Sequence, residues 1–231
     1  MKYLIFIFII FITSCSSSHH AILGSKLGWY VDKYNVKIIK DIKVSNLHIR
    51  EVRVDNSSCL QGYTHHIELN GPIGADSSSI IRSILEEINK YHKCKSRSGV
   101  RYVTDVYLNS NGGLLSHGIK LGKIFRSYGS ATIITDNQKC SSACAFAFVG
   151  GKYRKMEKNA QLMFHAPYYS QGYGGILCSN RIQMKNLETY FKEMLGLSAG
   201  NLLFERTMNY CSRNDGWVIN KDAAQIYNII N

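Results

Sequence analysis

Apolar residues follow two different periods along this chain. Residues 36–44 form a β-prone run, and residues 47–54 alternate apolar and polar side chains, so both segments are predicted to be β-strands. Such strands are mixed with charged residues throughout residues 25–64, so we expect a strand-rich extension there. From residue 65 the pattern changes to a strand followed by a helix. This change predicts that an α/β domain occupies residues 65–231.

The α/β repeat begins with three apolar strands, expected at residues 65–71, 104–110 and 130–136. Between them, apolar residues recur at helical spacing over residues 77–92 and 115–128. Strands that alternate with helices form parallel sheets joined by right-handed crossovers. Ligands of such sheets bind at the carboxyl ends of the strands, so we expect the functional site there.

The first fourteen residues contain one lysine followed by an apolar run that is too short to span a bilayer stably. This pattern predicts a signal peptide over residues 1–14. Residues 12–15, Ile-Thr-Ser-Cys, resemble the lipobox of bacterial lipoproteins. The resemblance implies cleavage before Cys15, lipid attachment to Cys15 and a polar tether over residues 15–24. We therefore expect an exported lipoprotein, anchored by this lipid on the periplasmic side of the cell envelope, at the outer membrane. The alternative is an ordinary secretory leader with an unmodified cysteine.

Six cysteines remain when Cys15 is set aside. An even number is typical of disulfides in an exported protein. The pairs that would tie flanking loops or brace one turn are Cys59 with Cys94, Cys178 with Cys211, and Cys140 with Cys144. Connectivity does not follow from sequence, and buried free thiols are the alternative. No Cys-x-x-Cys pair with matching histidines is present, so no zinc site is expected.

The formal net charge is +12, with lysines and arginines spread over the whole length. This charge favours contact with anionic headgroups, cell-envelope polymers or acidic substrates. No nucleic-acid-binding signature accompanies it, so no nucleic-acid partner is expected. No phosphate-binding Gly-x-x-x-x-Gly-Lys loop is present either, and we expect neither a cofactor nor an ATPase partner.

Three features stand at the expected carboxyl ends of strands. Gly112 and Gly113 can turn the backbone sharply and leave amides uncovered for an oxyanion. Ser141 and Ser142 open an apolar run of small residues that is typical of a buried helix. His165 ends an apolar strand. Each feature alone has an ordinary explanation as a turn, a helix cap or a structural histidine, but the three together in this order indicate a catalytic site.

The segments LNSNGG, SACAFAFVGG and LMFHAP resemble, in order and spacing, the three active-site segments of Clp-type serine peptidases. The resemblance covers about residues 65–228. It implies the spiral of β-β-α units with a parallel sheet that is shared by the Clp protease proteolytic subunit (ClpP) and crotonases. It is closest to exported relatives with a Cys-x-Ser-Ala-Cys nucleophile segment. Gly151 falls where the family has the glycine that ends this helix, which favours Ser142 over Ser141.

The family's roles map onto four residues of this chain. The resemblance implies that Ser142 is the nucleophile and His165 the general base and then acid. The amides of Gly113 and Ala143 would form the oxyanion hole.

The catalytic acid is expected at Asp215, because residues 215–230 resemble the family's closing segment. The match needs one extra residue, so Asn214 and Glu205 stay open as alternatives. Asp222 is expected to cap a helix.

We therefore expect an ATP-independent serine peptidase that hydrolyses short or unfolded peptides through a Ser-His-Asp triad. One alternative is a serine-lysine dyad as in signal peptide peptidase A, with its lysine at Lys152, Lys155 or Lys158. The other is a catalytically inactive binding lipoprotein that keeps the scaffold. A glycine- and tyrosine-rich segment at residues 168–175 suits a flap or a surface loop, and a helix at 182–196 suits a homo-oligomer.

Overall fold

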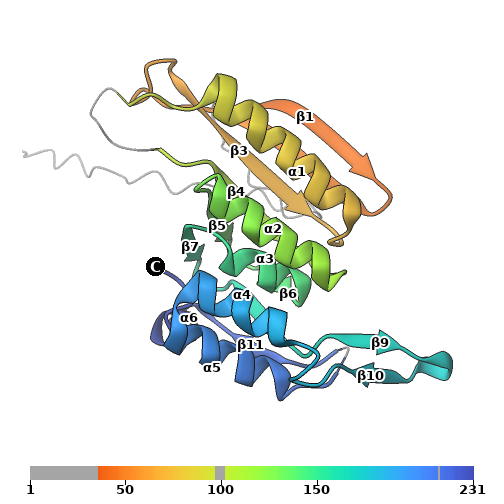
Figure 1. The fold of residues 1–231 in the computed structure, drawn as a ribbon. Helices are drawn as coiled ribbons and strands as arrows, with labels where there is room; N and C mark the ends of the chain where they lie inside the picture. Colours follow the sequence, from red (N-terminus) through yellow and green to blue (C-terminus); the bar gives the residue numbers. More distant parts are fainter. Residues whose placement is uncertain (1–35, 97–101, 213) are drawn as a thin grey trace, which may run out of the picture.

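The computed structural model describes residues 36–96, 102–212 and 214–231 (Figure 1). The predicted signal peptide, Cys15 and the tether lie outside these ranges, as does the start of the predicted extension. Among the helices within these ranges, none combines the length and the apolar composition that a bilayer span needs.

A six-stranded sheet forms the upper layer of the molecule, in the order β1-β2-β3-β4-β5-β7 (Figure 1). Its strands are β1 (Val36–Val44), β2 (Leu47–Asp55), β3 (Tyr63–Asn70), β4 (Asp105–Asn109), β5 (Ala131–Ile134) and β7 (Tyr153–Met156). The last four run parallel, whereas β1, β2 and β3 pair antiparallel. The expected strand-rich extension is thus present as a hairpin that continues the main sheet.

Two helices follow the strands of the parallel part, as the periodicity predicts. Helix α1 (Ala75–Glu87) continues as a single π-helical turn over Ile88–His92, and α2 (Leu115–Ser127) lies beside it (Figure 1). Gly129, in a left-handed conformation with φ +65°, follows the end of α2.

A second sheet of three strands stands below the first. It contains β6 (Lys139–Ser141), β8 (Gln161–Phe164) and β11 (Trp217–Ile219), in the order β11-β8-β6. Strands β6 and β8 are parallel, and β11 is antiparallel to β8. Because β6 leads into one candidate residue and β8 into another, this small sheet determines their separation.

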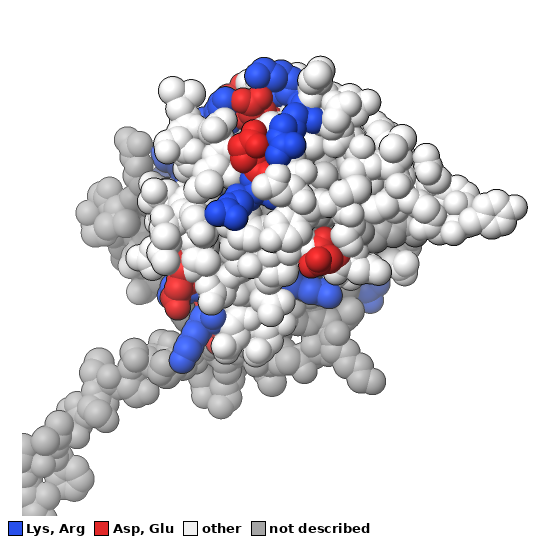
Figure 2. Space-filling view, turned by 90° about the horizontal axis from the view of Figure 1, so that it is seen from below, with Lys and Arg blue, Asp and Glu red and all other residues white. Residues whose placement is uncertain are grey.

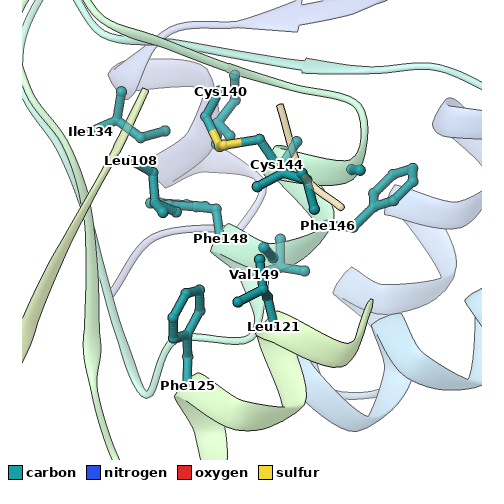
Figure 3. Close-up of a cluster of buried hydrophobic side chains, with 14 of the residues drawn as sticks. Leu108, Leu121, Phe125, Ile134, Cys140, Cys144, Phe146, Phe148 and Val149 are labelled. Carbon is teal, nitrogen blue, oxygen red and sulfur yellow. A yellow bond between two sulfur atoms is a disulfide. The ribbon is translucent and has the colours of Figure 1, made fainter. Parts of the chain in front are cut away.

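The buried helix α3 (Ala143–Val149) connects the two sheets, and every one of its residues is buried. Figure 3 shows its side chains among those of β4, β5 and α2, with the Cys140–Cys144 disulfide at one end. Arg126 of α2 donates from Nε to the carbonyl of Gly150 at 3.1 Å and from Nη2 to that of Met194 at 2.9 Å. One guanidinium therefore satisfies carbonyls at the ends of two helices.

The C-terminal third forms the lower part of the molecule (Figure 1). Its helices are α4 (Lys185–Leu195), α5 (Leu197–Met208) and α6 (Lys221–Ile226). Before them, β9 (Tyr168–Ser170) and β10 (Ile176–Cys178) form a hairpin that projects from the body, with a 3-10 turn over Gly172–Gly174 at its tip. Figure 2, seen from below, shows scattered clusters of basic and acidic side chains on this face. The part of the surface that projects to the right, on the side of the hairpin, carries no charged side chain in this view.

The three expected disulfides are confirmed: Cys59–Cys94, Cys140–Cys144 and Cys178–Cys211. The first ties the β2–β3 turn to the segment after α1, and the third ties the base of the β9–β10 hairpin to the segment after α5. The second closes a turn that spans only four positions of sequence.

Candidate active site

The site lies where β4 of the large sheet meets β6 of the small one. The amide of Ser110 donates to the carbonyl of Lys139 at 2.9 Å, and the amide of Ser141 donates to the carbonyl of Ser110 at 2.9 Å. These bonds hold the loop that follows β4 against the strand that leads into Ser142. The glycine pair and the serine are therefore brought together, as expected for the carboxyl ends of the strands.

Ser142 occupies an unusual backbone conformation, with φ +55° and ψ −123°. A residue with a side chain rarely adopts a positive φ, and such strain persists only where the surroundings hold it, often at functional sites. Ser142 is the residue before α3, but its side chain makes no capping hydrogen bond. The interpretation of this serine as a plain helix cap is therefore wrong, whereas Ser141 is an ordinary buried strand residue.

Gly112 packs directly against the serine. A Cβ atom at Gly112 would lie 2.7 Å from the Cβ of Ser142 and 3.2 Å from the amide nitrogen of Ala143. Its φ of +102° also disfavours any other residue. The loop can approach the serine this closely only because position 112 has no side chain.

Two main-chain amides next to Ser142 are available for a ligand. Among the described residues, no acceptor receives a hydrogen bond from the amide of Gly113 or from that of Ala143, the first residue of α3. The amide of Gly112, in contrast, donates to Ser110 Oγ at 3.0 Å. The free amides are thus the two that the sequence assigns to an oxyanion hole, and the positive end of the α3 dipole adds to their field.

His165 follows the last residue of β8 and is 4% exposed. Its Nδ1 atom lies 2.9 Å from the carbonyl oxygen of Ala166. A carbonyl oxygen can only accept, so Nδ1 carries the proton of the neutral ring and Nε2 is left as an acceptor. The ring stacks on Tyr168 of β9, with 5.5 Å between ring centroids.

Ser142 and His165 line one cavity of about 460 Å³. Its apolar wall comes from the start of α2, from α3 and from the segment before α4, through Leu115, Phe146 and Met184. Tyr168 and Tyr169 of the hairpin lie on its rim. No charged side chain is among the described residues that line it.

Ser142 and His165 share this cavity without a direct hydrogen bond between their side chains in the described part of the chain. Catalytic hydrogen bonds are often long in the absence of substrate and shorten in the complex. The arrangement therefore agrees with a resting serine–histidine pair.

The main chain near Asp215 passes close to His165, but the Asp215 side chain does not bond to the imidazole ring. Trp217 of β11 pairs with Phe164 of β8, so the residues just before Trp217 pass beside His165. The Asp215 side chain is exposed, and its Oδ1 accepts from the amide of Gly216 at 2.8 Å. The structure does not bring its carboxylate to the imidazole, and its catalytic role stays a prediction.

The other candidates for the acid also lie apart from the ring. Glu205 is exposed and pairs with Arg181 at 3.0 Å, and Asn214 is exposed. The expected helix cap at Asp222 is wrong. The cap of α6 is Asn220, whose Oδ1 accepts from the amide of Ala223 at 2.9 Å, because the helix begins one residue earlier than Asp222.

The three lysines of the dyad alternative do not line the cavity. Lys155 is in β7 and interacts with Asp105, the first residue of β4. Asp105 stands at the opposite end of β4 from the loop of Gly112 and Gly113. Lys152 precedes β7 at that same edge, and Lys158 is exposed in the turn that precedes β8.

The sequence did not reveal two partners of the histidine. The carbonyl of Ala166 is a main-chain atom, and any residue could supply it. Tyr168 was seen only as part of a glycine- and tyrosine-rich segment. No local pattern separates Tyr168, which stacks on the ring, from Tyr169, which also lines the cavity.

No model of a protein family matches the sequence, and no curated protein matches it. Solved structures do match. A serine-to-alanine variant of the 1510-N membrane-bound stomatin-specific protease superposes with a TM-score of 0.55 at 12% identity, over 72% of this chain and 75% of that chain. A lysine-to-alanine variant of the same protease, in complex with a substrate peptide, gives 0.52 at 15% identity, over 72% and 71%. A variant of ClpP1 from Listeria monocytogenes gives 0.49 at 15% identity, over 70% and 85%.

The likeness to the stomatin-specific protease establishes the fold of this chain. It is the Clp-type α/β fold, as the sequence motifs predict, and its solved neighbours are peptidases.

Proposed function

We propose that this chain is a serine peptidase that hydrolyses peptide bonds without ATP, with Ser142 as nucleophile and His165 as general base. The observation that carries the proposal is the left-handed backbone of Ser142 in a cavity shared with His165, beside two amides that have no acceptor among the described residues. Ser45 in the β1–β2 turn also has a positive φ, so the proposal rests on the combination of this backbone strain with the cavity and the two amides.

The reaction follows from the geometry. Nε2 of His165 accepts the Ser142 hydroxyl proton while Oγ attacks the peptide carbonyl carbon. The amides of Gly113 and Ala143 then donate to the oxyanion of the tetrahedral intermediate. The imidazolium returns its proton to the leaving amine, which gives an acyl-enzyme on Ser142. Water attacks this ester by the same steps, releases the acid and restores the free serine.

His165 needs a group that fixes its tautomer. In the described conformation the Ala166 carbonyl performs this role, because it holds the proton on Nδ1. We propose Asp215 as the third member of the triad in a supporting role, in which its carboxylate adds to the hold of the Ala166 carbonyl on the ring.

The substrate is proposed to be a short or unfolded peptide. An extended chain can pass over the exposed Gly113, while the cavity behind it has apolar walls suited to an uncharged side chain. One solved neighbour was captured with a substrate peptide, which supports this class of substrate for the fold. We propose that the reaction takes place at the cell envelope, with the protein anchored by a lipid on Cys15. We also propose that the protein forms homo-oligomers.

Two alternatives predict different chemistry. A serine-lysine dyad has support from the lysine variant of the stomatin-specific protease. Here His165, and no lysine, is among the described residues that line the cavity with Ser142. A non-catalytic binding lipoprotein would keep the scaffold and the cavity but show no turnover.

The test is hydrolysis of an unfolded, alkylated protein by the full-length chain, with products identified by mass spectrometry. We expect cleavage by the wild type and by Ser141→Ala, which keeps the cavity intact, but none by Ser142→Ala. Cleavage that persists in Ser142→Ala would contradict the assignment. A well-folded wild type that cleaves nothing would favour the binding-protein alternative.

A further inference from the structure

The Cys140–Cys144 disulfide encloses the proposed nucleophile. Cys140 belongs to β6 and Cys144 to α3, and Ser142 and Ala143 lie within the ring that the disulfide closes. This ring thus contains both the hydroxyl that attacks and one amide of the proposed oxyanion hole. Neither sulfur lines the substrate cavity.

The backbone inside the ring is held in a conformation that it would not adopt freely. The amide of Ser142 donates to the carbonyl of Met163 at 2.8 Å, and its carbonyl accepts from the amide of Phe146 at 3.0 Å. These two bonds fix the amide and carbonyl groups of the serine. The disulfide ties Cys140 to Cys144 across this turn, so the positive φ cannot relax by a movement of one cysteine relative to the other.

Both cysteines are anchored in the protein interior. Each is fully buried, with 0% exposure. Figure 3 shows them at the end of the cluster that contains Leu108, Ile134 and Phe148, so the ring is fastened to the core at both ends. A displacement of either cysteine would disturb close packing, and the disulfide prevents them from separating.

We propose that the Cys140–Cys144 disulfide is a positioning element of the active site, which holds Ser142 and the Ala143 amide in register with Gly113. The disulfide does not touch the substrate and takes no part in bond changes. The proposal rests on the proposed function. It deepens that function because the covalent ring would raise the rate at which Ser142 is acylated. Catalytic geometry is sensitive to displacements of about 1 Å, which can lower a rate by about a hundredfold.

The other two disulfides supply matched controls. Their cysteines are 35 and 33 positions apart in sequence, against 4 for the pair at the nucleophile. In the chain-entropy account, a disulfide that closes a longer loop restricts the unfolded chain more and stabilises the fold more. The short ring should therefore contribute least to global stability and most to the reactivity of Ser142. The Cys59–Cys94 disulfide should contribute more to global stability and little to the reactivity of Ser142.

The test compares Cys140→Ala/Cys144→Ala with Cys59→Ala/Cys94→Ala in the full-length chain. The readouts are the rate constant for modification by a fluorophosphonate, kcat and KM for a peptide substrate, and the thermal unfolding midpoint. For the pair at the nucleophile we expect modification and kcat to fall by about tenfold or more, with KM changed by less than about twofold. For the control pair we expect a larger loss of unfolding midpoint and nearly unchanged modification.

A second experiment covers the case in which the first double variant does not fold. A variant that keeps only Cys140 and Cys144 of the six cysteines is reduced with a phosphine and then reoxidised, while circular dichroism confirms that it stays folded. We expect reactivity to fall on reduction and to return on reoxidation. Reactivity that does not depend on the redox state in this folded protein would overturn the proposal.

The two proposals fail in different ways. If the wild type reacts with the fluorophosphonate at Ser142 and the disulfide variant reacts as fast, only the positioning role is wrong. If the folded wild type does not react at all, the proposed function fails, and the positioning role fails with it.

Discussion

The Nδ1 atom of His165 lies 2.9 Å from the carbonyl oxygen of Ala166, the next residue in the chain. This contact sets the tautomer of the imidazole, a task that serine triads usually give to a carboxylate. It leaves Nε2 as the acceptor nitrogen of a ring that lines the cavity shared with Ser142. The arrangement yields a direct test of how much the predicted aspartate contributes.

Asp215→Asn is expected to lower kcat by less than about tenfold, because the Ala166 carbonyl already keeps the proton on Nδ1. A triad whose tautomer depends on its aspartate loses about 10⁴-fold from the same change. The measurement is kcat for a peptide substrate at constant pH, with Glu205→Gln as a control on another acidic group near the chain end. A loss on the larger scale would mean that Asp215 turns onto the ring during catalysis.

His165→Ala is expected to abolish fluorophosphonate labelling, whereas Lys155→Ala should leave it unchanged. The imidazole lines the cavity with Ser142, whereas Lys155 is exposed on β7 and does not line it. The labelling rates of the two variants and the wild type decide the matter. Loss of labelling in Lys155→Ala with retention in His165→Ala would support the dyad alternative instead.

Gly112→Ala is expected to inactivate the protein, because the added Cβ would meet the Cβ of Ser142 at 2.7 Å. The matched control is Gly62→Ala. Gly62 also has a positive φ, of +78°, but a Cβ there meets nothing within 4 Å. The control should lose about 1 kcal/mol of stability from backbone strain and keep its activity. Peptidase activity and the unfolding midpoint of both variants provide the check, and an active Gly112→Ala would exclude the close approach of this loop to the nucleophile.

Glu51 of β2 should make stability depend on pH in the acid range. Burial opposes its ionisation, but the hydrogen bond with His65, at 2.5 Å, and the ion pair with Lys40, at 3.0 Å, outweigh that effect, so the pKa of Glu51 is lowered. A carboxyl whose pKa is lower in the folded state adds stability above its unfolded pKa, and this stability is lost as the pH falls through the folded pKa.

Glu51→Gln should therefore lower the unfolding midpoint at neutral pH, by an amount equivalent to about 1–3 kcal/mol, and the difference from wild type should shrink on acidification. Glu205→Gln, which removes an exposed pair with Arg181, should have little effect at any pH. Thermal unfolding of the three proteins between neutral and acid pH gives the comparison. A difference that grows toward acid pH would contradict the assigned sign.

The sequence predicted those features that arise from local pattern. A β-prone run and a clean alternation located β1 and β2 to within a residue, and helical spacing located α2 and its end before Gly129. The nucleophile segment, the glycine pair and the histidine were recognisable because the chemistry needs specific residue types there. The even number of cysteines indicated disulfides, but the structure was needed to establish which cysteines pair.

The remaining features depend on contacts between distant segments or on main-chain atoms. The sequence indicated strands in the extension but not their place at the edge of the main sheet, because strand order is not a local property. It placed Asp215 near the end of the chain but could not show the direction of its side chain. The Ala166 carbonyl carried no signal, since every residue has one.

The most direct test of the central claim is to map the site of fluorophosphonate modification in the full-length wild-type chain by peptide mass spectrometry. The account predicts one adduct, on Ser142, formed much faster than on any other serine, because among the serines that the structure describes only Ser142 combines a positive φ with a place in the cavity of His165. An adduct on Ser141 or elsewhere, or no adduct on the folded protein, would contradict it.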